Sequence, residues 1–282
     1  MLRCVSIATV TLSCFLASSL TAGSVTLFST GNPDGKIATL SRPGAVGAIE
    51  TETADDFILG QAARVTNATF TGLLTGNAPI IGGVGIELYH VFPGDSTNPP
   101  SGQVPTRVNS PSDNSFAAFA SADGTLTFTT TILNPSFTAA NSVVNGINTL
   151  PNQFTGGEGA VTGQEVEFDI TFTTPFSVGA ADHDFFRPEV EVTGGNFLWL
   201  SAPKPIVAPG TPFTPDLQSW IRNQNLSPDW LRIGTDITHQ GPFNAAFSLS
   251  GVVTPEPSSL VLTGAGLCAL LLQLLRRRAV RV

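Results

Sequence analysis

Hydrophobic and polar residues alternate along much of the chain with a period of two, the pattern of β-strands that have one buried and one exposed face. The clearest segment is 165–173, where acidic and hydroxyl side chains alternate with apolar ones. Its apolar side chains all point to one side: Val166, Phe168, Ile170 and Phe172. Residues 245–253 repeat the pattern. We therefore expect half-buried antiparallel strands, the first with a wet acidic face.

Further strands are predicted at 25–28, 56–59, 65–74, 84–92, 125–133, 189–192, 197–200 and 231–237. Turn-forming residues such as Gly, Pro, Asn and Asp separate them. One short helix is predicted after Thr214, which would cap it, with Pro215 in the first turn and Leu217, Trp220 and Ile221 on one face. Without βαβ alternation, the pattern predicts an all-β fold: an antiparallel β-sandwich, jelly-roll-like, with one short helix.

The first 23 residues have the order of a secretory signal peptide. Arg3 precedes an apolar run over residues 5–20, and Thr21-Ala22-Gly23 follows. We expect signal peptidase to cleave after Ala22 or Gly23. A lipoprotein signal ending at Cys14 and a retained first transmembrane helix are the two alternatives.

The last 28 residues, 255–282, combine three features: Pro255-Glu256-Pro257, a mostly apolar run over 258–275, and arginines at 276–278 and 281. Eighteen helical residues rise about 27 Å, close to the roughly 30 Å hydrocarbon core of a bilayer. The 21 residues before Ser258 contain no Lys or Arg, so the arginines indicate a cytoplasmic end and an outside location for the preceding domain. A buried core helix is the alternative.

This order of parts resembles the PEP-CTERM sorting signal of Gram-negative bacteria. The resemblance implies that the membrane protease exosortase recognises Pro255, Glu256 and Pro257. It also implies that residues 260–275 anchor the chain transiently in the inner membrane, and that Arg276, Arg277 and Arg278 stop it on the cytoplasmic side. The protein would then be released to the cell surface or extracellular matrix. Gln273, near the inner end of the span, departs from an all-apolar segment.

Four further stretches resemble segments of exported PEP-CTERM proteins of soil bacteria. They are Thr-Ala-Asp-Asp-Phe at 53–57, Val-Pro-Thr-Arg at 104–107, Thr-Gly-Gly-Glu-Gly at 155–159 and Phe-Leu-Trp-Leu-Ser at 197–201. This resemblance implies surface export and supplies no catalytic residue.

Removing both terminal signals leaves residues 24–254, enough for one large β domain, although a division near Leu150 is an alternative. The three cysteines, Cys4, Cys14 and Cys268, all lie in the signals, so the domain contains no disulfide and no thiolate metal site. Eight basic residues remain against 21 acidic ones, Glu256 included, a net charge of −13. Such a charge opposes binding to nucleic acid and anionic lipid.

The densest group of metal-ligating residue types is Asp182-His183-Asp184. Carboxylate oxygens suit a hard cation, so Asp182 and Asp184 are candidate ligands of a structural Ca²⁺. The alternative is a turn in which the aspartates accept hydrogen bonds from nearby backbone amides.

Two further candidate sites depend on which side chains are exposed. Trp199 lies between Leu198 and Leu200 on a predicted strand and could present a flat face to a sugar. Glu165 and Glu167 lie two positions apart on one strand face, about 7 Å from each other, a separation used by inverting glycosidases. Packing in the core and an ordinary solvated face are the respective alternatives.

These features together predict an exported, non-enzymatic structural or adhesive component of an exopolysaccharide matrix. The expected partners are signal peptidase and exosortase during export, the inner membrane transiently, and the exopolysaccharide itself. A carbohydrate-binding β-sandwich module with structural calcium is the second hypothesis, and a glycoside hydrolase is the third.

Overall fold

The computed structural model describes residues 23–147, 153–254, 266, 269 and 273. Over this part of the chain the backbone is mostly antiparallel β-sheet, which confirms the all-β prediction. The predicted signal peptide, apart from Gly23, lies outside the described residues, and so do Pro255, Glu256, Pro257 and the arginines at 276–278. No helix in the described part of the chain is long and apolar enough to cross a membrane.

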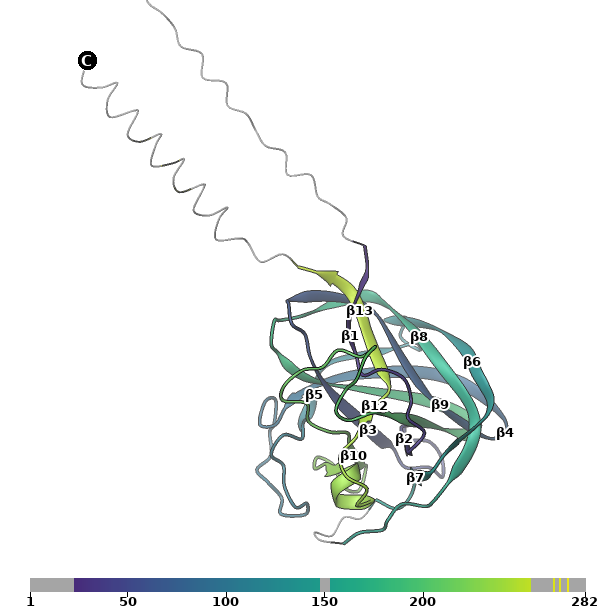
Figure 1. Cartoon of the computed structure of the whole chain (residues 1–282). Coiled ribbons are helices and arrows are strands. Elements are labelled where there is room, and N and C mark those ends of the chain that lie inside the picture. Colours follow the sequence, from purple (N-terminus) through teal and green to yellow (C-terminus); the bar gives the residue numbers. More distant parts are fainter. Residues whose placement is uncertain (1–22, 148–152, 255–265, 267–268, 270–272, 274–282) are drawn as a thin grey trace, which may run out of the picture.

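Figure 1 shows the strands and one short π-helix, η1, of the described residues. Their bounds are β1 Val25–Ser29, β2 Ile37–Leu40, β3 Thr51–Ile58, β4 Ala63–Val91, β5 Pro111–Ala120, β6 Leu126–Ala139, β7 Asn141–Val143, β8 Val161–Val178, β9 His183–Ala202, β10 Trp220–Asn223, β11 Leu231–Arg232, η1 Ile233–Ile237, β12 Asn244–Ala245 and β13 Phe247–Val253.

Two long strands, β4 and β9, form the spine of the sheet. They pair antiparallel from Gly72 opposite Trp199 to His90 opposite Asp184. The main order of strands is β1-β13-β4-β9-β3-β10-β11. Strands β5 and β8 also pair with β4, β6 pairs with β8, β2 and β12 pair with β9, and β7 pairs with β2.

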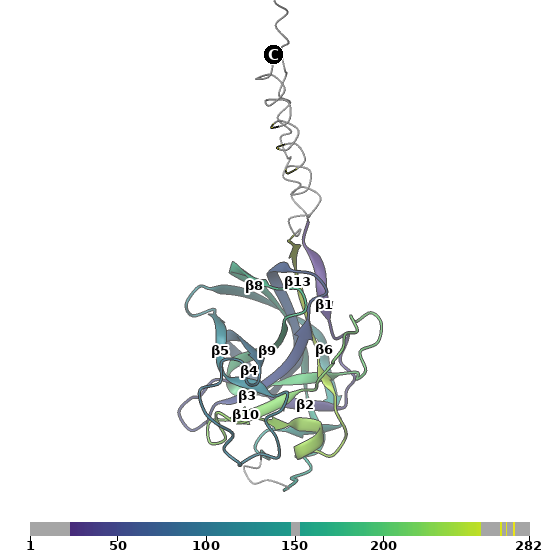
Figure 2. The same cartoon turned by 90° about the vertical axis from the view of Figure 1, so that its left-hand side faces the viewer.

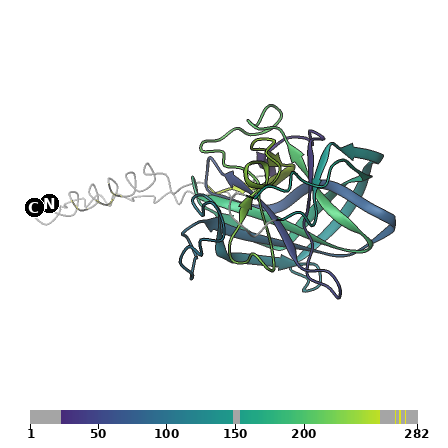
Figure 3. The same cartoon turned by 90° about the horizontal axis from the view of Figure 1, so that it is seen from below.

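Strand β4 bends near its middle, where its pairing with β9 shifts register between Gly76 and Ile80. Gly195 of β9 lies opposite Gly76, and a Cβ atom on Gly195 would come within 1.8 Å of the carbonyl oxygen of Thr75. The close approach of the two backbones therefore requires glycine at this point. Figures 2 and 3 show the resulting curvature of the sheet.

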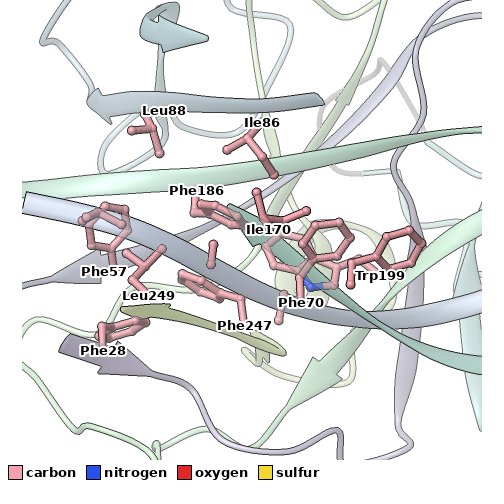
Figure 4. Close-up of a cluster of buried hydrophobic side chains, with 14 of the residues drawn as sticks. Phe28, Phe57, Phe70, Ile86, Leu88, Ile170, Phe186, Trp199, Phe247 and Leu249 are labelled. Atoms are coloured by element: carbon pink, nitrogen blue, oxygen red, sulfur yellow. The ribbon is translucent and has the colours of Figure 1, made fainter. Parts of the chain in front are cut away.

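The bend folds the sheet over a core that is rich in phenylalanine (Figure 4). Phe119 of β5 and Phe172 of β8 are in contact, with ring centroids 4.8 Å apart, although β5 and β8 pair with opposite ends of β4. Other rings stack face to face, Phe70 on Phe168 and Phe186 on Phe247. Such offset or stacked aromatic pairs add specific stabilisation to the burial of apolar surface.

The predicted helix after Thr214 is wrong. Residues 211–219 have no helical turn, and Trp220 begins strand β10, which pairs antiparallel with β3. Asp216, within the segment predicted as helical, lies with its Oδ1 atom 2.5 Å from Lys204 Nζ. Local capping signals are outweighed here by the burial of Trp220 and Ile221 against the sheet.

The first and last strands of the described domain lie side by side. Strand β1 pairs antiparallel with β13, with Val25 opposite Gly251. The chain thus enters the domain and leaves it at the same pole, at the top of Figures 1 and 2.

Candidate functional site

A polar groove of about 470 Å³ lies on the outer face of the sheet. Strands β4, β8 and β13 supply half of its lining residues, and the rest come from the end of β1, the turn that follows it, one residue of β6 and Ala246. The lining residues that could contact a ligand through polar atoms are Ser29, Asn32, Thr69, Thr71, Glu165, Glu167 and Ser248.

The alternation predicted for β8 explains why acids face the groove. Val166 and Phe168 are buried in the core, so Glu165 and Glu167 point to the opposite face. The pairing of β8 with β4 places Thr71 opposite Glu167, and Thr69 lies opposite Ser248 of β13. The register across three strands therefore gathers carboxylates and hydroxyls in one place.

The carboxylates of Glu165 and Glu167 have no oppositely charged partner among the described residues. Burial raises the pKa of Glu165 above its usual value. Burial, followed by the negative charge of Asp169, raises the pKa of Glu167. Neither carboxylate forms an ion pair or a hydrogen bond within the described part of the chain, whereas Thr69 and Ser248 are joined by a 2.7 Å hydrogen bond. The groove therefore offers free hydrogen-bond acceptors.

A second concentration of charge lies inside the domain around Arg187, whose side chain is 1% exposed. Its guanidinium lies 2.8 Å from Glu52, 2.8 Å from Glu189 and 3.0 Å from Glu50. Burial raises the pKa of Glu52, but Arg187 and Arg222 more than offset this effect, so the pKa lies below its usual value. Arg187 and Glu52 are buried and compensate each other's charge, whereas Glu50 and Glu189 hold the outer side of the network and are partly exposed to solvent.

The adjacent acids Asp55 and Asp56 are also enclosed. Asp55 accepts hydrogen bonds from the Ser219 hydroxyl and the Ala245 backbone N–H, both at 2.9 Å. Asp56 lies 2.7 Å from His183 Nε2. Burial, followed by the charge of Asp56, raises the pKa of Asp55 well above its usual value, and burial also raises the pKa of Asp56. These contacts attach β3 to the segments around it.

The two candidate calcium ligands are not brought together by the fold. Asp182 is exposed and accepts a 2.9 Å hydrogen bond from the Gly179 backbone N–H, which is the turn alternative. Asp184 is buried on β9 and lies 2.7 Å from His90 Nδ1. In the part of the chain that the structure describes, no group of three or more His, Cys, Asp or Glu residues could hold a metal ion.

Trp199 packs in the core, which is the alternative given above, so the hypothesis that it presents a face to a sugar is wrong. Its side chain is fully buried, and its indole N–H donates a 2.9 Å hydrogen bond to the Ala246 carbonyl oxygen. Its ring packs against Phe186 and Phe247 (Figure 4). Because β9 is covered on both faces at this point, alternation with Leu198 and Leu200 does not lead to exposure.

Two of the four internal stretches quoted above hold loops against the sheet. Arg107, from Val-Pro-Thr-Arg, is buried and pairs with Asp113 and Asp229. Glu158, from Thr-Gly-Gly-Glu-Gly, accepts hydrogen bonds from three consecutive backbone N–H groups at 144–146.

The other two stretches also fix neighbouring segments to the sheet. In the stretch 53–57 the Asp55 carboxylate accepts a hydrogen bond from the Ala245 backbone N–H, and in the stretch 197–201 the Trp199 indole N–H donates one to the Ala246 carbonyl oxygen. Each of the four motifs therefore contributes contacts that hold the scaffold together, and none of these four side chains lines the groove.

Sequence reasoning identified Glu165 and Glu167 but missed the hydroxyl and amide residues of the groove. The signal that could have found Thr69 and Thr71 is their spacing of two on the polar face of a predicted strand. Ser29, Asn32 and Ser248 join them only through strand pairing, which local patterns do not specify. A comparison of the chain with models of protein families, with curated proteins and with solved structures finds no match.

Proposed function

We propose that this chain is an exported protein of the cell surface or extracellular matrix, delivered by its N-terminal signal peptide and processed through its C-terminal PEP-CTERM signal. The observation that carries the proposal is the pairing of β1 with β13. Two membrane segments can both reach one bilayer directly only if the domain's ends leave it at the same pole, and the antiparallel pair provides this arrangement. The folded domain then extends away from the membrane.

In this proposal the exported domain is a non-enzymatic structural or adhesive component of an exopolysaccharide matrix, and its architecture is a jelly-roll-like β-sandwich. The single folded sheet with a continuous aromatic core supports this view. The four recurrent motifs support it as well, because their contacts fix loops to the scaffold. The negative charge of the domain favours solubility outside the cell and opposes a nucleic-acid partner.

A carbohydrate-binding module is the second candidate, and the polar groove favours it. Trp199 is buried and cannot contact a sugar, so this candidate rests on Glu165, Glu167 and the hydroxyl groups around them. The hydrolase hypothesis gains no comparable support, because Glu165 and Glu167 stand next to each other on one strand and do not face each other across the groove.

The sorting signal is tested by replacing Pro255, Glu256 and Pro257 with alanine in a Gram-negative host that contains exosortase. The wild-type domain is expected in the surface or medium fraction, and the variant is expected to stay in the inner membrane because its anchor is not removed. Replacing Asn98, Pro99 and Pro100, three exposed residues outside the groove, with alanine is a matched control that leaves the signal intact. Equal release of the sorting variant and the wild type would contradict the proposal.

A further inference from the structure

The groove beside β8 has the composition of a site that recognises hydroxyl groups. Glu165 and Glu167 offer carboxylate oxygens that no described residue engages, and Thr71 adds a hydroxyl group. Carboxylates accept hydrogen bonds from O–H donors more strongly than neutral acceptors do. A ligand that carries several hydroxyl groups on a compact frame would satisfy these acceptors at once.

The size and shape of the groove fit a small ligand or a few units of a chain. Its volume of about 470 Å³ lies within the roughly 300–1,000 Å³ typical of small-molecule sites. Leu133, 49% exposed, lines it as well. Its apolar surface can accommodate the C–H face of a sugar ring while the ring hydroxyls reach the carboxylates.

Electrostatics narrow the class of ligand further. No Lys, Arg or His is among the described residues that line the groove, and Asp169 lies two positions beyond Glu167 on the same face of β8. An anionic sugar such as a uronic acid would therefore meet uncompensated negative charge. A neutral sugar brings hydroxyl donors without that repulsion.

We propose that the groove formed by Glu165, Glu167, Thr71 and Leu133 binds a neutral saccharide, with the carboxylates accepting hydrogen bonds from sugar hydroxyls. This inference deepens the proposed matrix role and rests on it for its biological setting. Through this groove the domain would bind neutral stretches of a matrix polysaccharide.

The test uses the full chain in a zwitterionic detergent, because the sugar headgroups of maltoside detergents would compete for the site. Binding of cellohexaose, maltohexaose and mannohexaose is measured by isothermal titration calorimetry, with hexagalacturonate as the anionic probe and CaCl₂ as the cation probe. We expect at least one neutral hexasaccharide to bind and hexagalacturonate not to bind. The inference would be overturned if no neutral hexasaccharide bound, or if calcium were the only probe that bound.

Two double variants locate the site. Replacing both carboxylates, E165A/E167A, is expected to weaken binding of the neutral sugar by about tenfold or more, because two charge-assisted acceptors are lost. E165Q/E167Q, which keeps one acceptor oxygen on each side chain, is expected to lie between that variant and the wild type.

The matched control D123A/E191A removes the same charge outside the groove and is expected to bind like the wild type. Equal affinity of E165A/E167A and wild type, with both proteins folded by circular dichroism, would refute the site. This result would leave the sorting proposal untouched, since sorting is measured by fractionation and not by sugar binding.

Discussion

At the scale of single residues, the domain keeps charged side chains in its interior without any disulfide to support them. Arg187 and Arg222 balance the buried carboxylate of Glu52, while Asp55 and Asp56 rely mainly on hydrogen bonds. The difference is visible in the pKa values. The arginines hold the pKa of Glu52 below its usual value, whereas burial raises the pKa of Asp55 and Asp56.

These shifts predict that the domain becomes more stable as the pH falls from neutral toward the ordinary pKa range of carboxyl groups. A carboxyl with a raised folded-state pKa takes up its proton at a higher pH when folded than when unfolded, so its contribution to stability decreases as pH rises through the folded pKa. Among the described residues, seven carboxyls have raised pKa values: Asp55, Asp56, Glu165, Glu167, Asp184, Glu189 and Asp229.

Glu52 has the opposite effect on stability. Its folded pKa lies below its usual value, so its stabilising contribution is lost only when the pH falls through that folded pKa. Thermal unfolding of the full chain measured at pH 5, 6 and 7 checks the prediction. We expect the highest Tm at pH 5. A Tm that falls steadily from pH 7 to pH 5 would show that the buried acids do not govern the stability of the domain.

The candidate site was predictable in part at this scale. The acids of β8 could be placed on an outward face because period two fixes alternate sides of a strand. Trp199 shows the limit of the same rule, since alternation gives the side of the strand but not what covers that side. The contact with Ala246 that buries Trp199 comes from a segment 47 positions away in the chain.

At the scale of elements, strands with strong alternation were the easiest to predict. The predicted segment 165–173 lies within β8, and 25–28 lies within β1. The predicted segments 65–74 and 84–92 turn out to be the two ends of one long strand, β4. Gly76 and Pro79 lie between them and resemble a turn in the sequence, but they form a register shift within continuous pairing.

Elements that lack alternation escaped prediction. Polar and apolar residues do not alternate regularly along strands β2, β5, β7 and β10. Their pairing with distant strands creates them, as with Trp220 opposite Ala54. The false helix after Thr214 has the same origin, because local capping residues gave a signal that tertiary contacts overrode.

The bend of β4 against β9 offers a test at this scale. Gly195→Ala is expected to lower the free energy of unfolding by about 1–3 kcal/mol, because the new methyl group would displace the backbone of Thr75. Gly60→Ala is the matched control, since a Cβ atom there meets no atom within 4 Å. Urea unfolding of both variants measures the difference. Equal stability of the two variants would contradict the close approach of the strands.

At the scale of the whole molecule, three features are consistent with the export that we propose. Both ends of the domain lie at one pole, residues 24–256 have a net charge of −13, and all three cysteines lie in the terminal segments. Because residues 24–254 contain no cysteine, no disulfide can stabilise the domain, and a phenylalanine core and buried ion pairs do so instead. The groove lies on the outer face of the sheet, where a ligand can reach it from the solvent.

The most direct test of this account is the intact mass of the protein recovered from the cell surface or medium of an exosortase-containing Gram-negative host. The account predicts a polypeptide that starts within a few residues of Ser24 and ends close to Pro255, without the arginine tail. Recovery of the complete chain, from Met1 to Val282, in the cytosol would contradict it.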